Sequence, residues 1–207
     1  MSITTRMTYE ERGAVILEAA VRLFSERGFR GTTTRALAEA VGVTEPVLYE
    51  HFKSKRELYA AIVEAKSREG MARAEAWLQP LADAKDDRAV FIGVGRVILE
   101  SFSEDRAYAR LLLSAALEYP ELGAIFYERQ REGREKLAGY IAERIRDGAF
   151  GPVDPAIAAL AFIGMLYYRG LVGLLYCDDF TKASPQEAVE QVVGLFLRGI
   201  SSSVNAQ

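Results

Sequence analysis

The chain has 207 residues, of which 50% are hydrophobic, and a formal net charge of −3 at pH 7. This length suffices for a sizeable buried core, and the acidic balance excludes a general nucleic-acid binder, so any affinity for DNA must come from a local patch. The single cysteine, Cys177, excludes an intramolecular disulfide, and the segment MSITTRMTYEER has no apolar run that could serve as a secretory signal, so we expect a cytoplasmic protein.

The first predicted helix covers residues 11–27 and carries one apolar stripe. The side chains of this stripe recur at the spacing of a single helix face and are Val15, Ile16, Ala19, Ala20, Leu23 and Phe24. Gly28 and Phe29 follow as a turn. We expect this helix to be the platform for the elements that come next.

Residues 33–59 predict two short helices joined by a tight turn, which is a helix-turn-helix over about residues 32–52. The first helix follows hydroxyl side chains that can cap free amides and also suit a phosphate, namely Thr32, Thr33 and Thr34. Gly42 allows the sharp turn. The second helix begins with Thr44 as the expected N-cap, and its outer face is free to contact DNA through Thr44, Glu45, Pro46, Tyr49 and His51.

A third helix is predicted from Ser54 to about Leu78, ending near Pro80. Ser54 and Glu57 have the spacing of a capping box, and Lys55 lies in the first turn, where its side chain can reach a phosphate. At about 1.5 Å per residue the helix spans roughly 35 Å, so it can pass a tilt from one domain to another.

Charge supports DNA binding only weakly. Residues 1–70 carry 11 Lys and Arg against 10 Asp and Glu, whereas residues 71–207 carry 15 against 19. The basic side chains that cluster around the second helix of the pair are Arg35, Lys53, Lys55 and Arg56.

Helical patterns continue at about residues 87–102, 106–119, 121–147, 155–177 and 185–200, and strand signals are nearly absent. The predicted fold class is therefore all-α. A three-helix DNA-binding domain with a helix-turn-helix takes residues 1–65, and a larger helical domain for effector binding and dimerisation takes residues 66–207.

Residues 155–177 are long and apolar enough to resemble a membrane span. Arg169 at the centre, acidic rather than basic flanks and the lack of a second hydrophobic segment argue against one. We expect instead a buried helix with no membrane contact. The final helix adds a second apolar stripe, so the two together need a large partner surface, which a homodimer supplies as a four-helix bundle.

Apolar side chains of the middle helices either line an effector cavity or fill a core, and the sequence leaves both open. They are Trp77, Phe91, Phe102, Leu113, Phe126, Tyr127, Phe162, Met165, Leu166 and Tyr168. Arg169 either joins a salt bridge at the dimer interface or holds an acidic effector.

The spacing T-T-R-x-L-A-x-x-x-G-V-x-x-P-x-L-Y-x-H-F-x-x-K-x-x-L over residues 33–58 resembles the DNA-binding domain of TetR-family transcriptional repressors, and the resemblance covers about the first 65 residues. It implies phosphate contacts by Thr33, Thr34 and Lys55. It also implies base or backbone contacts by Arg35, Thr44, Glu45, Pro46, Tyr49 and His51. Glu45 departs from the chemistry of a phosphate site, since a carboxylate repels phosphate and can only accept from a base edge such as cytosine N4.

The resemblance further implies a repressor that binds double-stranded operator DNA, an inverted repeat with half-sites about one helical turn apart, and that a small, largely apolar effector releases. Its homodimer would form through the last two helices, about residues 155–177 and 185–200. The alternative is a DNA-binding regulator without a small-molecule effector, controlled by a protein partner.

An enzyme is the competing class, and the sequence lacks its parts. The single histidine, His51, lies in the DNA-contacting segment, and Cys177 lies in an apolar helix. There is no serine–histidine pairing, glycine-rich phosphate loop or spaced metal-ligand set. We therefore expect no catalytic residues, no cofactor and no metal site.

Overall fold

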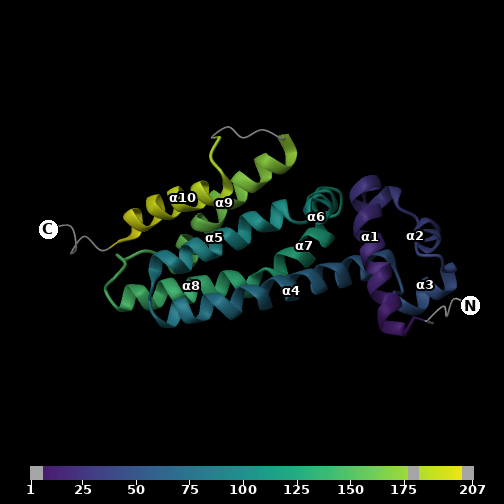
Figure 1. Ribbon diagram of the computed structural model, residues 1–207, viewed down its shortest axis with the longest axis horizontal. Coiled ribbons are helices and arrows are strands. Elements are labelled where there is room, and N and C mark those ends of the chain that lie inside the picture. Colours follow the sequence, from purple (N-terminus) through teal and green to yellow (C-terminus); the bar gives the residue numbers. More distant parts are fainter. Residues whose placement is uncertain (1–6, 177–181, 202–207) are drawn as a thin grey trace, which may run out of the picture. The chain divides into compact units, whose positions relative to one another are not determined.

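A computed structural model describes residues 7–176 and 182–201, so Cys177, Asp178 and Asp179 lie outside the described residues. In the described part, all regular structure is helical, which confirms the all-α prediction (Figure 1). The helices are α1 Tyr9–Gly31, α2 Thr34–Ala40, α3 Glu45–His51, α4 Lys55–Asp83, α5 Asp87–Ser103, α6 Arg106–Glu118, α7 Pro120–Arg129, α8 Arg131–Arg146, α9 Pro155–Tyr176 and α10 Pro185–Ile200.

Among the helices after Ser54, two differ from the prediction in extent. Helix α4 continues past Pro80 to Asp83, because a proline in the last turn removes only one backbone donor. The stretch predicted as one helix over residues 121–147 is two helices, α7 and α8, which are separated at Gln130.

The chain folds as two compact units. Unit 1 contains residues 7–66 together with Ala107–Arg129, and unit 2 contains Ser67–Arg106 together with residues 130–201. The boundary inside α4 therefore follows Lys66, close to the predicted domain boundary. The predicted first domain, residues 1–65, does not contain the α6 and α7 residues that belong to unit 1.

Helix α1 begins at a complete capping box, two residues before the predicted start. Thr8 Oγ1 accepts from the Glu11 amide at 3.2 Å, and the Thr8 amide donates to Glu11 Oε2 at 2.7 Å. Near the end of α1, Gly28 has φ 72°, a left-handed conformation that favours glycine and forms the predicted turn. The buried stripe of α1 includes Ile16, Leu23 and Phe24.

The core of unit 1 combines α1–α4 with α6 and α7. The buried residues that the two later helices add to this core are Leu111, Leu112, Ala115 and Leu122. Helices α6 and α7 also lie close together, since a Cβ added to Gly123 would be 3.0 Å from Ala116 Cβ. These residues follow the amino-terminal segment by more than 40 positions, so only tertiary packing brings them into the same core.

The hydroxyl of Tyr59 is a polar group inside the unit 1 core. The side chain is fully buried, and no described residue forms a hydrogen bond with Tyr59 Oη. Burial raises the pKa of the Tyr59 hydroxyl to about 12. An unpaired buried hydroxyl costs free energy, so Tyr59→Phe should raise the free energy of unfolding by about 1 kcal/mol, measured by urea denaturation.

Tyr140→Phe in unit 2 is the matched control, because Tyr140 Oη donates to Asp87 Oδ1 at 2.6 Å. Loss of that hydrogen bond should lower the free energy of unfolding by about 1 kcal/mol. A Tyr59→Phe protein that is less stable than the parent would show that its hydroxyl has a partner.

Unit 2 has its own core, built from α5, α8, α9 and α10 (Figure 1). At its centre, the Phe91 ring lies 4.9 Å from the Phe162 ring and 5.0 Å from the Phe196 ring, centroid to centroid. Helix α5 packs closely on its neighbours, because a Cβ added to Gly95 would be 2.9 Å from Val189 Cγ1. The same helix therefore holds α9 and α10 in place.

By length and composition, α9 is the one helix among the described residues that could cross a membrane. One such helix is weak evidence for a membrane protein, because the core helix of a soluble protein passes the same test. Its buried face carries Ala158, Phe162, Leu166 and Leu174, which belong to unit 2. The apolar composition of α9 thus has a structural reason within unit 2.

Candidate functional site

Helices α2 and α3 form the predicted helix-turn-helix. Thr33 is the N-cap of α2, and its Oγ1 accepts from the Ala36 amide at 3.1 Å. The turn contains Gly42 at φ 70°, and the Val43 amide donates to Ala38 O at 3.0 Å. Thr44 is the N-cap residue of α3 by position, but its side chain makes no capping hydrogen bond.

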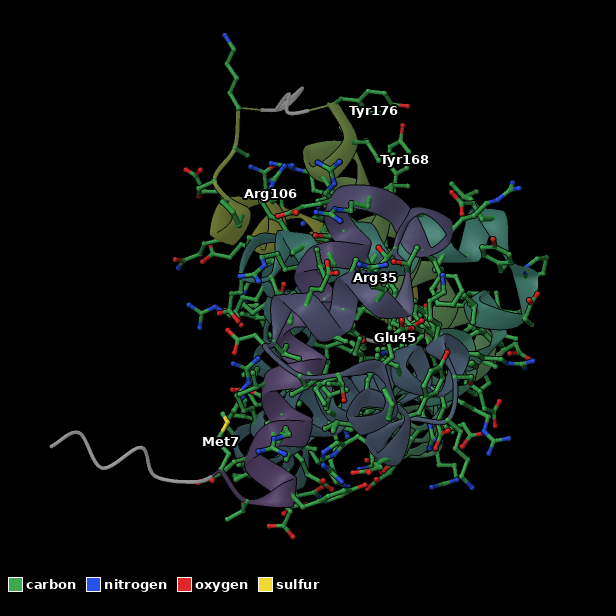
Figure 2. All side chains as sticks on the ribbon, turned by 90° about the vertical axis from the view of Figure 1, so that its right-hand side faces the viewer. Met7, Arg35, Glu45, Arg106, Tyr168 and Tyr176 are labelled. Atoms are coloured by element: carbon green, nitrogen blue, oxygen red, sulfur yellow. The ribbon has the colours of Figure 1, made fainter. Side chains whose placement is uncertain are left out.

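The two faces of this pair differ in burial. The inner face packs Leu37, Ala38 and Leu48 into the unit 1 core. On the outer face, Thr44, Pro46 and Tyr49 are exposed. Figure 2 looks onto this side of unit 1 and shows Arg35 and Glu45 near one another on it.

The outer face has an internal hydrogen-bond network. Thr34 Oγ1 donates to Glu45 Oε2 at 2.7 Å, which joins the first turn of α2 to the first turn of α3. Tyr49 Oη lies 3.5 Å from Thr34 Oγ1, at the limit of a hydrogen bond. The Glu45 carboxylate is therefore held in a defined position, and it has acceptor capacity beyond the one bond.

Arg35 lies on the exposed side of α2. Its Nε donates to Glu39 Oε1 at 3.0 Å in an i,i+4 pair whose side chains are largely exposed. The hydrogen bond and charge of Glu39, with a smaller contribution from Glu45, raise the pKa of the Arg35 guanidinium. Exposed pairs of this kind contribute little free energy, so Arg35 can exchange Glu39 for a base or a phosphate at small cost.

His51 contacts a residue that the sequence analysis missed. The Tyr9 ring stacks on the His51 ring at a centroid distance of 4.0 Å, and Tyr9 Oη donates to Glu50 O at 3.0 Å. The start of α1 therefore holds the end of α3. The spacing of Thr8 and Glu11 in the sequence could have predicted this contact. It is that of a capping box, which places Tyr9 at the first position of α1.

Lys55 has partners within unit 1. Its Nζ donates to Phe29 O at 2.7 Å and to Thr32 O at 2.8 Å, and lies 4.6 Å from the centre of the Phe29 ring. Burial lowers the pKa of the Lys55 ammonium. The side chain thus joins the start of α4 to the end of α1 and to Thr32, which follows α1, whereas Lys53 and Arg56 beside it are exposed. A phosphate contact by Lys55 stays a prediction.

Lys55→Met should lower the free energy of unfolding by about 1–3 kcal/mol, because two backbone carbonyls lose a charged donor while the apolar stem remains. Urea denaturation measures this change, with the exposed Lys53→Met as control. The salt dependence of DNA binding tests the phosphate contact separately, since loss of one contact lowers the slope by about 0.9. Unchanged stability would refute the structural role, and an unchanged slope would refute the phosphate contact.

The residues predicted to bind an effector do not all line one pocket. Phe91 and Phe162 are fully buried in the unit 2 core, whereas Tyr127 and Tyr168 are largely exposed. The ring of Trp77 covers Gly93, and Met165 is partly exposed. Three members of the group, Leu113, Phe126 and Tyr127, belong to unit 1 rather than unit 2.

Two of the predicted residues, Phe102 and Arg169, do line a pocket of about 110 Å³ in unit 2. We call it the arginine pocket, and its other walls include Leu99, Arg106, Gly170 and Leu174. The sequence analysis missed Arg106, because that residue follows a polar turn and shows no pattern that connects it with α9.

Comparison with known protein families supports the assignment of α2 and α3 as a helix-turn-helix. A family model described as bacterial regulatory proteins, tetR family, matches residues 16–62, which contain α2 and α3. A second model, described as AefR-like transcriptional repressor, C-terminal domain, matches residues 92–199, more than half of the chain. The chain belongs to the TetR family of bacterial regulatory proteins. It is accordingly a DNA-binding transcriptional regulator with a helix-turn-helix.

Individual relatives cover most of the chain. The transcriptional regulator RutR of Escherichia coli K12 is 28% identical over 198 residues, which are 88% of this chain and 79% of RutR. The flavonoid-responsive regulator FrrA has a solved structure with a TM-score of 0.68 and 25% identity, covering 93% of this chain and 98% of FrrA. The fatty acid degradation regulator FadR of Bacillus halodurans has the same fold, with a TM-score of 0.78 at 19% identity over 91% of this chain and 95% of FadR.

RutR is described as a transcriptional regulator, and FrrA and FadR are described as regulators. Family membership also accounts for the order of elements, with the helix-turn-helix first and the larger helical part after it. It does not assign the DNA-contacting or effector-binding residues of this chain, which stay predictions.

Proposed function

We propose that the protein is a cytoplasmic repressor that binds an inverted-repeat operator as a homodimer and leaves it when a small, largely apolar effector binds. The observation that carries the DNA-binding part is the outer face of α2 and α3, where Thr34 holds Glu45 in place and Tyr49 is exposed. The description of the carboxyl-terminal family model as that of a repressor supports the direction of regulation.

Glu45 and Arg35 are the proposed base-contacting residues. A carboxylate accepts hydrogen bonds and is repelled by phosphates, so Glu45 would select a base that presents an amino group in the major groove, such as cytosine N4. Arg35 would donate to guanine O6 and N7 after leaving Glu39. Backbone contacts would come from Thr33, Thr44, Pro46, His51 and Lys55.

An apolar face of unit 2 supports the homodimer. Helices α9 and α10 leave large apolar side chains exposed on the side away from their core, namely Ile157, Leu160, Met165, Tyr168, Leu175, Tyr176 and Leu195. Large apolar side chains that are exposed on helices of one unit are typical of an interaction site. Pairing of two copies through α9 and α10 would cover it and place two copies of α3 for two half-sites.

The effector is supported by the arginine pocket and by the family, in which FrrA is described as flavonoid-responsive. The alternative is control by a protein partner. The small volume of the pocket, about 110 Å³ against the usual 300–1,000 Å³ for ligand sites, favours this alternative. A thermal-shift screen separates the two, since stabilisation by a small molecule requires a site.

The test of the proposed function is a selection of bound duplexes from a randomised pool, followed by anisotropy titration of the best sequence at several salt concentrations. We expect an inverted repeat. Arg35→Ala and Glu45→Ala should each relax the preference at one base pair by about 1–3 kcal/mol, whereas Glu18→Ala on α1 should change nothing. A pool without any enriched sequence would refute the proposal, and a uniform loss of affinity would remove the residue concerned from base recognition.

A further inference from the structure

A hydrogen bond between two side chains joins the helices of the helix-turn-helix. Thr34, the first residue of α2, donates from Oγ1 to Oε2 of Glu45, the first residue of α3, at 2.7 Å. The two residues are 11 positions apart, and the bond is partly buried. A hydrogen bond to a charged group is stronger than one between neutral groups, so the Thr34 hydroxyl restricts the direction of the Glu45 carboxylate.

Thr33 and Thr34 use their hydroxyl groups differently. A hydroxyl has one proton to donate, and a phosphate oxygen can only accept. Thr34 gives its proton to Glu45, and its Oγ1 lies 3.5 Å from Tyr49 Oη, which is placed to donate to it. Thr33 Oγ1 instead accepts from the Ala36 amide, a bond that leaves the Thr33 proton for a phosphate. Thr34 could donate to the DNA backbone only by giving up its bond to Glu45.

Arg35 is a cation close to the Glu45 carboxylate. The hydrogen bond and charge of Glu39 raise the pKa of the Arg35 guanidinium, and the charge of Glu45 adds to this rise. Figure 2 shows Arg35 and Glu45 near one another. Without the bond to Thr34, attraction would draw the carboxylate towards the guanidinium, and an ion pair between them would take both side chains away from base edges. The bond between Thr34 and Glu45 opposes that pairing.

We propose that Thr34 is a positioning residue for base recognition, whose hydroxyl holds the Glu45 carboxylate in the direction of one base pair and makes no phosphate contact of its own. This role rests on the proposed function, in which Glu45 accepts from a base edge. A carboxylate whose direction is fixed before binding loses less conformational freedom when it accepts from an amino group such as cytosine N4. Thr34 therefore sets the preference at one base pair without touching the DNA.

Anisotropy titration of the full-length protein tests this role. The selected operator is compared with duplexes in which one base pair is changed, and Glu45→Ala first identifies the pair that Glu45 contacts. The parent should prefer its own base pair there by roughly 5- to 150-fold, the range expected for one base contact. Thr34→Val has the same shape without the hydroxyl and should lower that preference at least about threefold. Thr34→Ser retains the hydroxyl and should restore the parent's preference.

A double-mutant cycle separates positioning from a direct phosphate contact. In the Glu45→Ala background, where no carboxylate is left to position, Thr34→Val should change operator affinity by less than about twofold. A phosphate contact by Thr34 would instead give the same loss in both backgrounds and at every base pair, which would overturn the positioning role. A Thr34→Ser protein that behaves like Thr34→Val would overturn it as well. Thr34→Ala, with a smaller side chain, replaces Thr34→Val if that variant does not fold.

Failure of the proposed function gives a different result. A pool without any enriched sequence would refute the operator, and the positioning role with it. An operator at which Glu45→Ala relaxes no base pair would remove both Glu45 and Thr34 from base recognition, although the protein would still bind specific DNA. If Glu45→Ala relaxes one base pair and Thr34→Val keeps the parent's preference there, the role of Thr34 alone is overturned.

Discussion

Ile157→Glu combined with Tyr168→Glu is expected to convert the protein to a monomer of 22.9 kDa and to weaken binding to the inverted repeat roughly 100-fold. Both side chains are about 69% exposed on the apolar face of α9, so the substitutions leave the unit 2 core intact. In a symmetric dimer each glutamate would occur twice, and four buried carboxylates without partners would oppose association.

Light scattering after size-exclusion chromatography measures the mass, and anisotropy titration measures the affinity. Leu117→Glu is the control, because Leu117 is an equally apolar side chain that is 86% exposed on α6 in unit 1. It should leave the mass and the affinity unchanged. A double variant that remains a dimer would show that α9 is not in the interface, and a monomer with parental affinity would show that DNA binding does not require dimerisation.

Leu111→Ala is expected to lower the free energy of unfolding of unit 1 by about 3 kcal/mol and to reduce DNA binding at physiological temperature. Leu111 is fully buried in the core that also contains Leu37 and Leu48 of the helix-turn-helix. Truncation would leave a cavity in that core, which Leu111 shares with Leu48 of α3 although the two residues are 63 positions apart in the chain.

Hydrogen exchange of α1–α3 amides together with urea denaturation measures this effect. Leu117→Ala on the same helix is the control, since its side chain is exposed. A loss below about 0.5 kcal/mol for Leu111→Ala, within the range of surface substitutions, would mean that residues 7–66 hold their structure without α6 and α7.

Helix α6 contributes residues to both units. Its first residue, Arg106, lines the arginine pocket of unit 2, and Leu111, five residues later, lies in the core of unit 1.

Local features of the fold could be predicted from the sequence because they depend on neighbouring residues. The Gly42 turn follows from the left-handed backbone that glycine accepts, and the N-cap of α2 follows from the Thr33 hydroxyl. Ser184 and Glu187, three residues apart, form a capping box at the start of α10, with reciprocal bonds at 3.2 Å and 2.8 Å. The family pattern over residues 33–58 similarly depends on short spacings, and the family match over residues 16–62 contains it.

The predicted capping box at Ser54 is only partly formed in the structure. Ser54 Oγ accepts from the Glu57 amide at 3.1 Å, as the spacing predicts. The Glu57 carboxylate instead accepts from the Lys53 amide at 2.8 Å, one residue earlier than a capping box requires. The spacing of Ser54 and Glu57 correctly predicted the start of α4. The path of the chain before Ser54 decided that the Glu57 carboxylate accepts from the Lys53 amide.

The sequence by itself determined the helical elements, the helix-turn-helix and the family, because periodicity, capping residues and turn glycines act over a few positions. Only the tertiary structure decided that Lys55 donates to the carbonyls of Phe29 and Thr32, that Arg106 and Arg169 line one pocket, and that α6 and α7 complete the unit 1 core. Each of these joins residues at least 23 positions apart. Such contacts arise from the packing of whole helices, which no local pattern in the chain records.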